Sequence, residues 1–79
     1  MKLDIISPEK VLFSGNVVSV TLPGVMGGFT ILENHAPVIS SLQKGILVYR
    51  QNENDKEIEV PINGGFVEGK NNEINACID

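Results

Sequence analysis

The chain has 79 residues and a mass of 8.6 kDa, which leaves room for one small domain, residues 1–79, and excludes a multi-domain enzyme. With 42% hydrophobic and 20% charged residues, it has the composition of a globular protein. The net charge is −4, and residues 51–79 hold seven acids against two cations, so we expect no binding of nucleic acid or of anionic lipid headgroups.

The single cysteine and the hydropathy of the chain exclude further classes of protein. Cys77 alone cannot form an internal disulfide framework or a cysteine zinc site. No apolar run reaches the ~20 residues that cross a bilayer, and Met1–Asp4 does not begin a secretory signal. We therefore expect a protein of a reducing compartment that is not inserted in a membrane and holds no metal or cofactor.

Alternation of apolar and polar residues is the dominant pattern, and it predicts β-strands. In chain order, short β-rich runs occupy residues 3–6, 10–13, 17–22, 45–50, 57–62, 65–69 and 73–78. Turn-forming residues separate the runs, at Ser7-Pro8, Ser14–Asn16, Pro23-Gly24, Gly27-Gly28, Lys44-Gly45, 51–56, Asn63–Gly65 and Lys70–Asn72. The sequence thus predicts an all-β fold, a flattened antiparallel β-sandwich or barrel with essentially no helix.

Two hairpins are predicted within this pattern. Residues 45–50 and 57–62 flank a polar loop, so Glu57 and Glu59 must face water, because burying unpaired carboxylates is costly. Residues 65–69 and 73–78 flank a turn with Asn71 and Asn72, and asparagine tolerates the left-handed conformation that tight turns need.

His35, in Asn34-His35-Ala36-Pro37, is the only histidine. It is a candidate general base or metal ligand, and a small enzyme that uses it is one hypothesis for the chain. No serine, cysteine or acid stands at a spacing that indicates a triad, and no second metal ligand is evident. A structural or interfacial imidazole is the favoured interpretation.

The segment Gly24-Val25-Met26-Gly27-Gly28-Phe29 is rich in glycine, like a phosphate-binding loop. It lacks the lysine and the Ser/Thr of a P-loop, and no helical pattern follows it. A tight turn between strands is therefore favoured. Met26 then lies either at a contact surface near the loop tip or folded back into the core.

Residues Asn54–Pro61 carry an Asp-Lys pair at the end of a polar loop, followed by an alternating strand. This arrangement looks like the lipoyl-bearing hairpin of swinging-arm carrier domains. The resemblance implies modification of Lys56. The alternative is a solvated loop in which Lys56 offsets neighbouring acids, and no internal repeat of the kind found in carriers is present.

Several short motifs occur in order along the chain. They are Leu3-Asp4-Ile5-Ile6-Ser7-Pro8-Glu9, Leu12-Phe13-Ser14-Gly15, Leu22-Pro23-Gly24, Gly27, Phe29-Thr30-Ile31-Leu32, Asn34-His35-Ala36-Pro37, Gly45-Ile46-Leu47 and Gly64-Gly65-Phe66-Val67-Glu68. In this order and spacing they resemble the N-terminal domain of the epsilon subunit of F-type ATP synthase. The resemblance runs from about residue 3 to residue 78 and implies a flattened sandwich of about ten strands.

The resemblance also implies a function. The domain would be a non-catalytic rotor part of the central stalk, on the cytoplasmic face of the bacterial membrane, that joins the gamma subunit to the ring of c subunits. It would contact gamma through Ser7, His35, Ala36 and Ser40. It would contact the c-ring through the loop made by Val25, Met26, Gly27, Gly28 and Phe29.

Two departures from the family pattern qualify these expectations. Many members have an acid where this chain has Gly28, so Met26 and the loop backbone are the expected substitutes in the c-ring contact. The usual subunit continues into a C-terminal pair of helices, whereas this chain ends at Asp79. We expect no helical inhibitory domain and no bound nucleotide.

Overall fold

The computed structural model describes residues 1–79 as nine strands without a helix, which confirms the all-β prediction. The strands are β1 (Lys2–Ile6), β2 (Val11–Asn16), β3 (Ser19–Leu22), β4 (Phe29–Leu32), β5 (Val38–Leu42), β6 (Gly45–Arg50), β7 (Ile58–Ile62), β8 (Gly65–Lys70) and β9 (Glu73–Ile78). The structure contains no helix that is long and apolar enough to cross a membrane.

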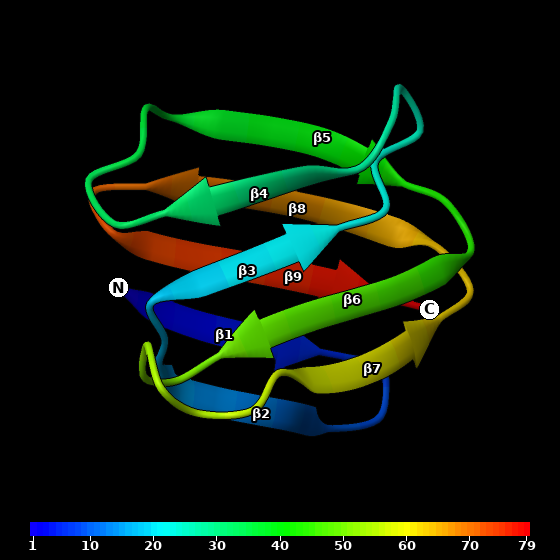
Figure 1. Ribbon diagram of the computed structural model, residues 1–79. Helices are drawn as coiled ribbons and strands as arrows, with labels where there is room; N and C mark the ends of the chain where they lie inside the picture. Colours follow the sequence, from blue (N-terminus) through cyan, green and yellow to red (C-terminus); the bar gives the residue numbers. More distant parts are fainter.

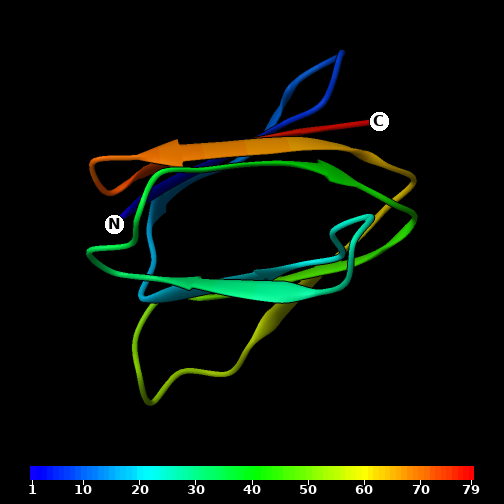
Figure 2. The same ribbon diagram turned by 90° about the horizontal axis from the view of Figure 1, so that it is seen from above.

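The strands form two sheets that pack face to face (Figures 1 and 2). The five-stranded sheet has the order β2-β1-β9-β8-β5, and the four-stranded sheet has the order β4-β3-β6-β7. Six strand pairs are antiparallel, as expected for a sandwich, but β1 and β9 are parallel. The alternation of side chains is the same in parallel and antiparallel strands, so the sequence pattern does not reveal this pair.

The core lies between the sheets because each strand turns alternate apolar side chains inward. Fourteen buried residues form one cluster, and Leu3, Ile5, Val20, Leu47 and Val67 are among those with no exposed surface. Burial of such a side chain stabilises the fold by about 1.5–3 kcal/mol.

An aromatic pair extends the core at one edge of the sandwich. The rings of Phe13 and Tyr49 lie 4.3 Å apart between centroids, inclined at 31°. Burial raises the pKa of the Tyr49 hydroxyl above its usual value of 10.0. The pair joins β2 to β6 and so ties the two sheets together.

Both predicted hairpins are confirmed, by the β6–β7 and β8–β9 pairings. Glu57 and Glu59 are exposed, as predicted. The β8–β9 turn consists of Asn71 and Asn72, with φ values of 55° and 59°. Two successive positive φ values are typical of the type I′ turn, whose twist matches that of the flanking strands.

The sequence pattern misplaced one turn and did not predict the strands β4 and β5. Ser14–Asn16, predicted as a turn, completes β2, and Gly15 pairs with Leu3. A Cβ atom on Gly15 would lie 3.0 Å from the Phe13 ring, so the glycine leaves space for that ring. The pattern did not predict β5, because its polar Ser40 lies in the inward row while Ile39 faces outward with 77% of its surface exposed.

Candidate interaction surface

The loop of residues 23–28, between β3 and β4, is fastened to the opposite sheet. The Val25 N–H donates to the Ser41 C=O at 3.0 Å, and the Gln43 N–H donates to the Pro23 C=O at 2.8 Å. These bonds flank an isolated antiparallel bridge between Gly24 and Leu42. The loop therefore has a fixed position at the end of β5, as the favoured tight-turn interpretation requires.

Apolar and backbone groups dominate the surface of this loop. Met26 is 96% exposed, so it lies at the contact surface and not in the core, and Val25 is 51% exposed. Gly27 and Gly28 are also exposed, whereas Phe29 packs partly against the core. No charged residue stands between Lys10 and Glu33. Any partner of the loop therefore meets an uncharged, apolar tip.

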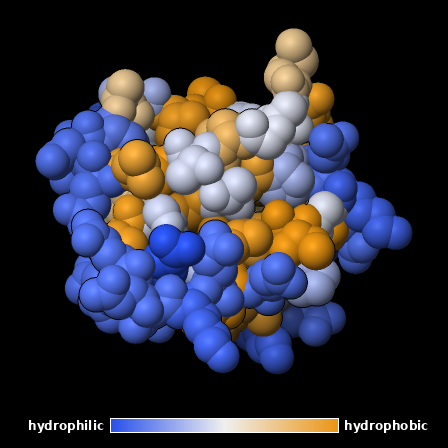
Figure 3. Space-filling model, viewed as in Figure 1, coloured by the Kyte–Doolittle hydropathy of each residue, from blue (hydrophilic) through white to orange (hydrophobic).

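The neighbouring face of the four-stranded sheet continues this uncharged surface. Figure 3 shows apolar and weakly polar side chains over the middle of that face, with the loop of residues 23–28 projecting at the upper right. Leu32 and Ile46 are 58% and 49% exposed there, and the hydroxyls of Thr21 and Thr30 share a hydrogen bond of 2.8 Å. The sequence analysis did not single out this face.

The loop of residues 33–37, between β4 and β5, is held by a pair of asparagines. The Asn34 N–H donates to Oδ1 of Asn72 at 2.7 Å, and the Asn72 side-chain amide donates to Oδ1 of Asn34 at 3.1 Å. Asn34 also has a φ of 63°. These bonds join the loop to the β8–β9 turn and position His35, which follows Asn34.

The His35 ring has one hydrogen-bond partner. Its Nδ1 lies 2.9 Å from the Ala36 C=O, an acceptor, so Nδ1–H donates there. Nε2 is buried and has no partner, and the ring lies against Gly69, where an added Cβ would be 3.2 Å from Cε1. No acid or hydroxyl bonds to the ring, and no group of three or more His, Cys, Asp or Glu could hold a metal ion. The hypothesis of a small enzyme thus gains no support.

A shallow cleft of about 350 Å³ lies beside His35, along the open side of the sandwich. It is lined by residues of β4, of the following loop and of the start of β5: Phe29, Thr30, Ile31, Leu32, Glu33, His35, Ala36, Pro37 and Val38. Because β4 and β5 are edge strands of different sheets, the two sheets do not close here (Figure 2). The cleft gives access to His35 and Ala36 from that side.

Three of the four gamma-contact candidates lie on one segment of the chain. His35 and Ala36 stand in the loop before β5, and Ser40 lies within β5, where its hydroxyl donates to the Ser41 C=O at 3.0 Å. Ser7 follows β1 and bonds to Lys10. Because β9 and β8 separate β1 from β5, Ser7 lies apart from this segment.

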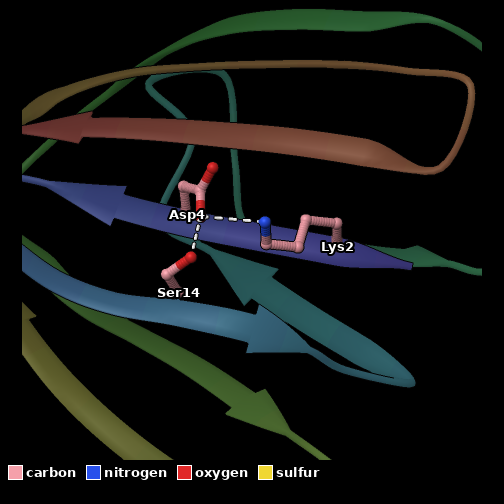
Figure 4. A network of polar contacts seen from close by, with 3 residues as sticks. All are labelled: Lys2, Asp4 and Ser14. Atoms are coloured by element: carbon pink, nitrogen blue, oxygen red, sulfur yellow. Dashed lines mark hydrogen bonds and ion pairs between the residues drawn. The ribbon is translucent and has the colours of Figure 1, made fainter.

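Two other polar groups are surface features. Asp4 accepts a hydrogen bond of 2.6 Å from the Ser14 hydroxyl, and its carboxylate lies 3.9 Å from the Lys2 ammonium group (Figure 4). An exposed ion pair of this kind contributes little to stability.

Lys56 is exposed in the loop of residues 51–57, where the Asn52 side-chain amide donates to Asp55 at 2.8 Å. Nothing in that loop distinguishes a modified lysine from a solvated one.

This arrangement defines the structural class: a small, helix-free β-sandwich with two exposed loops that are hydrogen-bonded to distant parts of the chain. The profile described as "ATP synthase, Delta/Epsilon chain, beta-sandwich domain" matches residues 1–79. The chain therefore belongs to the delta/epsilon family of ATP synthase subunits, as the resemblance in its motifs predicted.

Relatives and solved structures agree with this family. The ATP synthase epsilon chain of Leptospira interrogans is 47% identical over 79 residues, which are 100% of this chain and 61% of that relative. The chain thus spans less than two thirds of such relatives.

In solved structures, the fold matches a chain of the Euglena gracilis mitochondrial ATP synthase OSCP/F1/c-ring assembly with a TM-score of 0.87 and 20% identity. That match covers 96% of this chain and 48% of the other. A chain of the Tetrahymena thermophila mitochondrial ATP synthase central stalk and c-ring matches with a TM-score of 0.82 and 17% identity, over 99% of this chain and 62% of the other.

Proposed function

We propose that this chain is a non-catalytic part of the rotor of a bacterial F-type ATP synthase, where it joins the gamma subunit to the c-ring at the cytoplasmic face of the membrane. The observation that carries the proposal is the family match over residues 1–79. The structures with the same fold contain ATP synthase c-rings, and one is described as a central stalk.

The fastened loops support this role mechanically. A part that transmits torque must hold its contact residues in place, and the loops of residues 23–28 and 33–37 are each bonded to a distant strand or turn. The first would contact the c-ring through Val25, Met26, Gly27, Gly28 and Phe29. The second would contact gamma through His35 and Ala36, with Ser40 beside them and Ser7 at a separate point.

The c-ring contact would be apolar in this protein. Gly28 supplies no carboxylate, and Met26 projects fully into solvent on an uncharged loop. Since apolar contacts are less sensitive to salt than ion pairs, binding to a purified c-ring should weaken little with rising salt. Met26→Ser should reduce that binding, whereas Lys56→Ala, at an exposed residue outside this loop, should not.

The decisive test is binding of the purified gamma subunit from the same cell to this 79-residue chain. We expect a stable complex that is weakened by His35→Ala and unchanged by Lys56→Ala, a variant at an exposed loop residue far along the chain. Failure of the folded wild-type chain to bind gamma would contradict the proposed function. A lipoyl group on Lys56 of the native protein would favour the carrier alternative instead.

A further inference from the structure

The four sheet edges of this sandwich differ in how well they are protected against pairing with another chain. Edge strand β7 contains Pro61, which lacks an N–H donor, and the register of β2 shifts at a bulge opposite Ile5 and Ile6. Prolines and bulges are common ways to block an edge. Strands β4 and β5 have neither, contain no charged residue, and pair with β3 and β8 over four and five consecutive positions. The edge of β5 differs from that of β4 because another segment of the chain already pairs with part of it.

One end of the β5 edge is already paired with a segment from the same chain. Ser41 and Gln43 bond through their backbones to Val25 and Pro23, on the side of β5 away from β8. Backbone groups of alternate residues in a strand point to the same side, so those of Ile39 point to this free side as well. The intramolecular pairing stops before Ile39 and leaves its N–H and C=O without a strand partner.

A cleft at the start of β5, lined by Val38 and not by Ile39 itself, suits a side chain of an extended polypeptide segment. The cleft beside β5 has a volume of about 350 Å³ and five of its nine lining residues are hydrophobic, so it has space for an apolar side chain. A segment with an apolar side chain next to its pairing residue suits this cleft.

We propose that the gamma subunit binds this edge by strand addition: an extended, uncharged segment of gamma pairs with the free backbone groups of Ile39. An apolar side chain of that segment enters the cleft. The proposal rests on the proposed function, because His35, Ala36 and Ser40, the gamma-contact candidates, border this edge. Main-chain hydrogen bonds supply the affinity in this mode of recognition, and the cleft supplies the selectivity.

Amide hydrogen exchange of the full chain, free and in complex with purified gamma, is the direct test. Strand addition should slow exchange of the Ile39 amide at least about tenfold, which corresponds to roughly 1.4 kcal/mol of protection. The exposed amides of Glu53 and Asn54, in the loop of residues 51–57, should exchange equally fast in both states. Unchanged exchange at Ile39 in a formed complex overturns the proposal and leaves the proposed function standing. Absence of any complex counts against the proposed function itself.

Two variants separate the backbone of Ile39 from its side chain. Ile39→Pro removes the N–H on the free side and should weaken gamma binding about tenfold, because one hydrogen bond at the interface is lost. Ile39→Ala keeps the N–H and should weaken binding no more than about threefold. Equal weakening by both variants contradicts strand addition.

Two controls complete the test. Denaturant unfolding of each variant checks the fold, and the exchange experiment on the wild-type chain decides the outcome if Ile39→Pro does not fold. Protection of the Ile39 amide that rises with chain concentration in the absence of gamma would show pairing with a second copy and would also overturn the proposal.

Discussion

The two loops beside β4 and the loop between β6 and β7 differ in how the rest of the chain holds them. All three are rich in residues that form turns and are mostly exposed. Residues 23–28 are hydrogen-bonded to Ser41 and Gln43, and residues 33–37 are hydrogen-bonded to Asn72. Residues 51–57 bond among themselves and, by an ion pair of 3.6 Å between Glu57 and Arg50, to the strand next to them.

This difference separates loops that present a surface from a loop that only connects two strands. The fastened loops hold Met26 and His35 at defined positions, and both residues belong to the proposed contacts with the c-ring and gamma. The loop of residues 51–57 carries several charges and has no bond to the other sheet. The comparison predicts that stability depends strongly on the fastened loops and weakly on the third.

The largest effect is expected at Gly24. A Cβ atom there would lie 2.7 Å from the Gly27 C=O and 2.8 Å from the Phe29 ring, so Gly24→Ala must displace the loop from Leu42. We expect a loss of about 2–3 kcal/mol in the free energy of unfolding, measured by denaturant titration. Gly28→Ala is the matched control, because its Cβ would meet only the Leu22 C=O at 3.6 Å. Equal stability of the two variants would show that the loop is not fastened.

A smaller effect is expected at Asn72. Glycine accepts the φ of 59° at this position but removes both hydrogen bonds to Asn34, so Asn72→Gly should cost about 1–2 kcal/mol in urea unfolding. Asn71→Gly is the control, since Asn71 has a φ of 55° in the same turn and stands outside the asparagine pair. If the two glycine variants unfold at the same urea concentration, the bonds to Asn34 contribute nothing.

The sequence predicted those parts of the fold that depend on neighbouring residues. The hairpins of residues 45–62 and 65–78 follow from local alternation and from asparagines that accept positive φ. It did not predict β5, where Ile39 faces solvent and Ser40 faces inward, or the parallel pairing of β1 with β9. These features are set by contacts between distant segments, which local periodicity does not encode.

The same limit applies to the candidate site. Residue type singled out His35 and Met26, and the motifs placed both in a family. The bonds between Asn34 and Asn72 join positions 38 residues apart, so no pattern along the chain points to them. The free edge at Ile39 becomes visible only once β5 is placed at the border of its sheet. A search for unpaired apolar residues in short β-rich runs could have found Ile39.

The smallest effect is expected from lengthening the loop of residues 51–57. Three glycines inserted between Asp55 and Lys56 lie outside the turn in which Asn52 bonds to Asp55. They should cost only about 0.3 kcal/mol, because the entropy of loop closure grows with the logarithm of loop length. The same insertion between Met26 and Gly27 should cost more than about 1 kcal/mol, because it disrupts the turn in which the Gly27 N–H donates to the Gly24 C=O at 2.9 Å. Thermal unfolding of both variants measures the difference. Similar costs would mean that the hydrogen bonds to β5 do not restrain the first loop, and the distinction between presenting and connecting loops would then fail.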